Sequence, residues 1–63
     1  MIEIVIERWV GTDGSTDHLW SLWRDGNRLQ IGNKHDSSEA AKFEALAFCQ
    51  RELGVEPDRI TIL

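Results

Sequence analysis

The sequence is poor in the residues that cross-link or anchor small domains. Its 63 residues include one proline and no tyrosine. They also include only one cysteine, so no internal disulfide can form. No apolar stretch approaches the roughly 20 residues needed to span a bilayer, and the first residues carry no signal-peptide pattern. These absences predict a single domain over residues 1–63, in a reducing, cytoplasmic setting.

Positive charge is also scarce. The chain carries 7 Lys and Arg against 11 Asp and Glu, a formal net charge of -4 at pH 7. Nucleic-acid-binding domains neutralise phosphates with clustered Lys and Arg, whereas the basic residues here are scattered singly among acids. Direct binding of DNA or RNA is therefore disfavoured. An acidic chain is suited to staying in solution, or to docking on a basic protein surface.

Candidate metal-binding residues do not form a complete site. Asp13, Ser15 and Asp17 match the first odd-numbered ligand positions of a calcium loop, but the match ends there. His18 stands where the turning glycine belongs, and Arg24 where the bidentate acid belongs. No Cys/His cluster indicates zinc, and no glycine pattern indicates a phosphate site. We expect no metal and no cofactor.

The two histidines are the only candidates for catalysis. His18 follows Asp17 and His35 precedes Asp36, and a His–Asp pair can act as a general base. A small hydrolase is therefore one hypothesis. No nucleophile stands beside either histidine at a familiar spacing, and the single Cys49 lies in an apolar context typical of a buried residue. The sequence predicts no catalytic residues and no enzyme activity.

Hydrophobic periodicity defines three leading strands. Residues 2–10 alternate with a period of two, which is typical of a half-buried strand. Residues 11–17 have the composition of a loop. Residues 18–24 and 28–31 are rich in strand formers and flank the turn sequence Asp25-Gly26-Asn27, a strong hairpin signal.

The period then changes to that of a helix. Residues 40–53 are helix formers, with Asp36, Ser37 or Ser38 as the cap and Gly54 as the stop. A short strand follows at 59–63. The order β-β-β-α-β predicts an α+β two-layer sandwich, in which a three-stranded antiparallel meander is crossed by one helix. The fourth strand should return parallel to the first or third.

One helix covers only one face of such a sheet, so the side chains divide into a covered and an open set. A two-residue turn predicts that Trp20, Leu22, Leu29 and Ile31 lie under the helix. The other covered residues are Ile2, Ile4, Ile6, Ile60 and Ile62, with Leu46, Cys49, Leu53 and either Phe43 or Phe48 from the helix. The open face should carry Val5, Trp9, Leu19, Ser21, Trp23, Arg28, Gln30 and Thr61, flanked by Glu3 and Glu7.

An open face with two tryptophans is typical of a protein-binding site. Helix-side acids could also mimic phosphates for a basic partner. The alternatives are that the open face closes a homodimer, or that its side chains simply pack on one another. The predicted partner-binding residues are Val5, Trp9, Leu19, Trp23, Glu3 and Glu7 on the face, and Glu39, Glu44, Glu52 and Glu56 on the helix side.

Two known families share features with this chain. Three strands followed by Asp36-Ser37-Ser38-Glu39-Ala40-Ala41 resemble the amino-terminal domain of Hic-type antitoxins, which bind and block a small ribonuclease toxin. That family normally has a Gly-Cys step in the third strand, where this chain has Ile31-Gly32-Asn33.

In size, acidity and lack of catalytic groups, the whole chain resembles small phage-encoded anti-CRISPR inhibitors. Those proteins bind a basic effector subunit and prevent it from binding its target DNA. Both resemblances imply stoichiometric inhibition through protein contact, and neither transfers a site residue to this sequence. The sequence itself leaves open whether the chain is a monomer or a homodimer.

Overall fold

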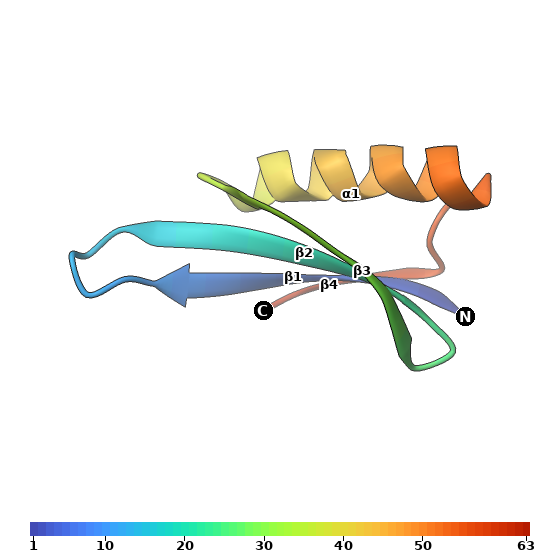
Figure 1. Cartoon of the computed structure of the whole chain (residues 1–63), viewed down its shortest axis with the longest axis horizontal. Coiled ribbons are helices and arrows are strands. Elements are labelled where there is room, and N and C mark those ends of the chain that lie inside the picture. Colours follow the sequence, from blue (N-terminus) through green and yellow to red (C-terminus); the bar gives the residue numbers. More distant parts are fainter.

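The structure is a computed structural model that describes all 63 residues. It contains the strands β1 (Ile2–Val10), β2 (Thr16–Arg24), β3 (Asn27–His35) and β4 (Arg59–Ile62), and the helix α1 (Ser38–Leu53). The strands form one mixed sheet in the order β3-β2-β1-β4, with α1 packed across one face (Figure 1). The predicted α+β architecture is confirmed.

The pairing follows from the connections. Short loops make β1, β2 and β3 an antiparallel meander, and β4 returns parallel to β1 after the helix crossover, as expected. Asp25 and Gly26 form the tight turn between β2 and β3 with φ values of 50° and 83°, which match the positive φ that a two-residue hairpin turn requires. The β1–β2 hairpin extends past the helix at its loop end (Figure 1).

The helix is fixed at both ends by its own sequence. Ser37 is the cap, and its Oγ accepts a hydrogen bond from the Ala40 amide at 3.1 Å. Gly54 ends the helix with φ of 67°, and its amide donates to the Gln50 carbonyl at 2.9 Å. Ser37 is one of the three predicted caps, and the helix begins at Ser38, before the run of helix formers that starts at Ala40.

The core lies between α1 and the covered face of the sheet. The sheet supplies the large buried side chains, and the helix supplies small ones at four-residue spacing, which lets it pack close to the strands. Phe48, Leu46, Leu53 and Ile60 pack at the margin. The buried residues of the core are Ile2, Ile4, Ile6, Trp20 and Leu22 from the sheet, and Ala41, Ala45 and Cys49 from the helix.

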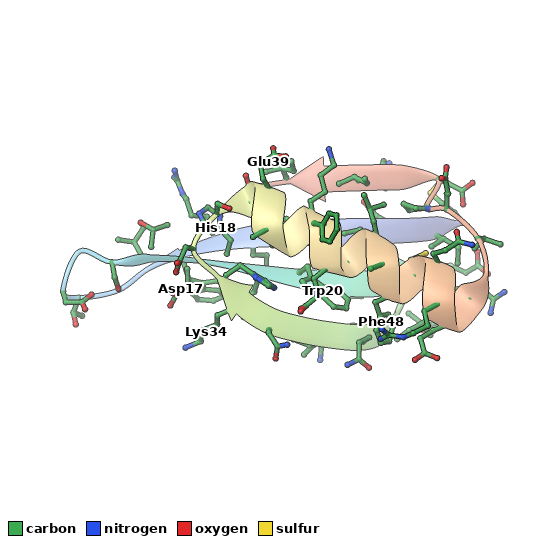
Figure 2. All side chains as sticks on the ribbon, turned by 90° about the horizontal axis from the view of Figure 1, so that it is seen from above. Asp17, His18, Trp20, Lys34, Glu39 and Phe48 are labelled. Carbon is green, nitrogen blue, oxygen red and sulfur yellow. The ribbon has the colours of Figure 1, made fainter.

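Trp20 occupies the middle of this interface (Figure 2) and is 3% exposed. Its indole lies 5.4 Å from the Phe48 ring, measured between centroids. A Cβ atom on Gly32 would lie 1.9 Å from Trp20 Cε2, so only glycine leaves room for the ring at this point of β3. Of the two phenylalanines considered for the core, Phe48 is the one that packs, while Phe43 is 78% exposed on the outer side of the helix.

The prediction for β3 is wrong in one respect. Leu22 pairs with Gln30 and Trp23 pairs with Arg28, so Leu29 is an extra residue with no partner. This bulge reverses the alternation of the strand although the turn has the expected two residues. Ile31 therefore pairs with Ser21 and lies on the open face, Gln30 moves to the covered side, and Leu29 is 45% exposed rather than buried.

Candidate functional site

The open face of the sheet is organised in three rows of side chains that cross β1, β2 and β3. Backbone pairing places Glu3, Trp23 and Arg28 in the first row. The second and third rows follow from the same registers: Val5, Ser21 and Ile31, then Glu7, Leu19 and Lys34. We call these nine residues, with Trp9 beyond the third row, the open face.

Apolar side chains are accessible at the middle of the open face. Trp9 is 59% exposed and Ile31 is 50% exposed, while Val5 and Leu19 are half-buried. A hollow of about 210 Å³ lies among them, lined by Glu7, Trp9, Leu19, Ser21, Arg28 and Ile31, with the backbone of β2 at Trp20. Contiguous apolar surface bordered by charged groups is typical of a protein contact site.

Trp23 differs from Trp9 in being held by its neighbours. Its Nε1 donates to Ser21 Oγ at 2.8 Å, which satisfies the indole and explains why a serine is buried in the sheet. The Arg28 guanidinium carbon lies 6.0 Å from the Trp23 ring centroid, within reach of a cation–π contact. Trp23 is thus a fixed part of the surface, and Trp9 is the freer aromatic group.

The two glutamates of the face also differ. The Glu3 carboxylate accepts hydrogen bonds from Arg59 Nε at 3.0 Å and from Thr61 Oγ1 at 2.8 Å, which join β1 to β4. These bonds, with Arg59 as the main cause, hold the pKa of Glu3 below its usual value. Glu7 makes no hydrogen bond or ion pair with any other side chain, and neither does Lys34 in its row.

Glu44 has a role that the sequence did not indicate. Its Oε1 accepts from Trp20 Nε1 at 2.7 Å and from the Asn33 amide at 3.4 Å, and lies 3.1 Å from His35 Nε2. These donors, led by the Trp20 indole, lower the pKa of Glu44 to about 2. The carboxylate therefore joins α1 to β2 and β3 within the chain, and we leave it out of the proposed contact surface.

The remaining predicted acids are spread over the helix side. Glu39 is exposed in the first turn of α1 (Figure 2). Glu52 is exposed near the other end, 3.6 Å from Arg51 Nε, and Glu56 is exposed between α1 and β4. A 16-residue helix is roughly 24 Å long, so these acids form two separate groups and not one patch.

The two histidines lie side by side at one end of the β2–β3 hairpin. His18 on β2 pairs directly with His35 on β3. The polar group beside His35 is Glu44 and not the adjacent Asp36, while Asp17 pairs with Trp9 and so projects to the opposite face from His18. The hydrolase hypothesis finds no support in this geometry, because neither predicted His–Asp pair is formed.

Asp13 and Cys49 both make their contacts within the chain. In the loop between β1 and β2, Asp13 Oδ1 accepts from the amide and hydroxyl of Ser15 at 3.0 and 2.7 Å, so it closes a local turn. Cys49 is fully buried, and burial raises the pKa of its thiol, as expected for a core residue. No group of three or more His, Cys, Asp or Glu side chains is placed to hold a metal ion.

The single helix is neither long nor apolar enough to cross a membrane. Comparison with known proteins finds no family model, curated protein or solved structure that matches this chain.

Proposed function

We propose that this chain is a non-catalytic protein-binding protein that acts by stoichiometric contact through its open face. The observation that carries the proposal is the exposure of Trp9 and Ile31 around a hollow on the open face of the sheet. Aromatic groups that enter a partner's pocket supply a large share of the energy of protein interfaces. Trp23 and Ser21 stabilise this surface, because the hydrogen bond between them holds both side chains in place on the open face.

In its more specific form, the proposal is that the bound protein is a basic, nucleic-acid-handling effector, which the chain inhibits. The net charge of -4 supports this form, since it favours encounter with a basic surface. The exposed acids Glu39, Glu52 and Glu56 on the helix side would add to the long-range attraction through the net charge, while the open face makes the contact. A reducing compartment such as the cytoplasm suits the single thiol of Cys49.

The test is capture of partners by the immobilised chain, compared across matched variants. Trp9→Ala and Trp23→Ala should each weaken the complex by roughly 2 kcal/mol or more. Phe43→Ala is the matched control, because it removes an aromatic ring that is 78% exposed on the outer side of the helix. A captured protein that binds all three variants equally would contradict the proposed site.

The inhibitory form has its own readout. Nucleic-acid binding by the captured effector should fall linearly with added chain and reach a plateau at a fixed ratio of chain to effector. Higher salt should slow association, and Glu39→Lys with Glu52→Lys should do the same at constant salt. A captured protein that is acidic, or whose nucleic-acid binding is unchanged at saturation, would rule out this form and leave the general one standing.

A further inference from the structure

The charged residues of the open face are arranged so that the face is complementary to itself. In the first and third rows an acid stands on β1 and a base on β3, with an apolar residue between them on β2. The second row has apolar residues on both outer strands and the small Ser21 in the middle. If a row is turned round and placed over a second copy of itself, acid therefore meets base and apolar residue meets apolar residue. The rows are Glu3–Trp23–Arg28, Val5–Ser21–Ile31 and Glu7–Leu19–Lys34.

Within one chain the acid and the base of each row do not pair with each other. β1 and β3 are separated by β2, and neighbouring strands lie about 4.8 Å apart, so the acid and base of a row stand roughly 10 Å apart at the backbone. Glu7 and Lys34 accordingly have no ion-pair partner in the structure. Glu7 and Lys34 are therefore available to pair with charges of opposite sign on another molecule.

From this pattern we infer that the open face binds a second copy of the chain, about a two-fold axis that runs along β2. Such an axis places β1 of each copy over β3 of the other. Glu7 then faces Lys34 of the second copy and Val5 faces Ile31, each contact occurring twice. Glu3 lies opposite Arg28, while its carboxylate keeps its bonds to Arg59 and Thr61 of its own chain. The inference rests on the proposed function in one respect only, that the open face is a contact surface.

Packing is consistent with this arrangement. Sheets that stack face to face lie about 10 Å apart with their strands nearly aligned, which the proposed axis produces. The axis passes above Ser21, which faces Ser21 of the second copy, so the hollow beside this small side chain leaves room where the two sheets meet. Trp9, one row beyond Glu7, would cover the aliphatic stem of Lys34 from the second copy.

The size of the open face limits how tightly two copies of the chain can bind. The longest dimension of the molecule, 38 Å, runs along the strands, and the shortest, 15 Å, runs across them (Figures 1 and 2). A face of that outline is smaller than the roughly 800 Å² per partner of a standard stable interface. We therefore expect a reversible dimer, with a dissociation constant on the order of micromolar to tens of micromolar.

The test uses charge reversal and sedimentation equilibrium from about 1 µM to about 1 mM chain at about 0.15 M salt. Glu7→Lys alone, or Lys34→Glu alone, brings like charges together at both symmetric positions and should weaken the dimer by about tenfold or more. An equimolar mixture of the two variants should form a heterodimer as strong as the natural pair, because every contact is again between opposite charges. The doubly reversed chain should also pair normally.

Matched controls separate this effect from net charge. Glu39→Lys and Lys42→Glu on the helix make the same changes in total charge away from the face, and should leave the dimer unchanged. Circular dichroism confirms that each variant is folded. A chain that stays monomeric at about 1 mM, or a mixture that associates no better than its components, overturns the inference. In either case partner capture by Trp9 and Trp23 still decides the proposed function independently.

Discussion

The two faces of the four-stranded sheet differ in how far their side chains are buried. On the covered face Ile4 and Leu22 are fully buried, and the buried Trp20 indole donates its N–H to Glu44. On the open face Trp9 and Ile31 are half or more exposed, and Glu7 and Lys34 are unpaired. The covered face holds the fold together, and the open face is free to evolve toward contact.

The largest predicted effect comes from the tightest point of the covered face. Gly32→Ala places a methyl group within the volume of the Trp20 ring, so either the indole leaves the core or β3 shifts. We expect a loss of about 3 kcal/mol or more in the free energy of unfolding, measured by urea titration. Gln30→Ala, at an exposed position of the same strand, is the control and should cost under about 0.5 kcal/mol.

The second prediction concerns the carboxylate that joins the helix to the sheet. Glu44→Ala removes the acceptor of the buried Trp20 N–H, which should cost about 2 kcal/mol in chemical denaturation. Glu44→Gln keeps an acceptor of the same shape and should cost about half as much. If both variants were as stable as the natural chain, Glu44 would not be joining α1 to β2 and β3.

The same carboxylate predicts a dependence of stability on pH. Its pKa in the folded chain, about 2, lies below the ordinary value of 4.5. A lowered pKa means that the contribution is complete above pH 4.5 and is lost as the pH falls from 4.5 toward 2. The carboxylate is partly exposed, so screening reduces the effect to about 1 kcal/mol. Thermal unfolding of Glu44→Gln should show a flatter profile over this range than the natural chain.

The smallest effect on stability is expected on the open face. Trp9→Ala should change the free energy of unfolding by less than about 0.5 kcal/mol, because the ring has few neighbours to lose. The same variant should lose partner binding, so stability and binding separate at this residue. A large loss of stability in Trp9→Ala would mean that this ring is part of the core, and that the two faces are less distinct than their exposures indicate.

Much of the covered face was predictable from the sequence. The period-two alternation in β1 determines which of its side chains point toward the helix, and Gly54 determines where the helix ends. The parallel placement of β4 followed from the connection through α1. The error in β3 arose because a bulge at Leu29 has no clear local signature in the sequence. Continuing the alternation of β2 through the turn into β3 therefore assigned Ile31 and Gln30 to the wrong faces. It assigned Trp20 and Leu22 to the covered face correctly.

The candidate site was only partly accessible by the same reasoning. Val5, Trp9, Leu19 and Trp23 lie on the predicted face, because β1 and β2 pair without irregularity. Lys34 was missed because β3 extends to His35, four residues past its expected end, and regains pairing after a second irregularity beside Trp20. The bond between Trp20 and Glu44 joins residues 24 positions apart, a distance over which no sequence period applies.

The position of β1 between β2 and β4 has a consequence for how the chain matures. β1 can pair with β2 early, through a short hairpin, but its other edge is closed by residues 56 positions later, as Arg59 aligns with Glu3. During synthesis the isoleucine-rich first strand therefore presents an unpaired edge until β4 has emerged from the ribosome. Glu3 and Glu7 place negative charge along that strand, which discourages two nascent chains from joining edge to edge in the interval.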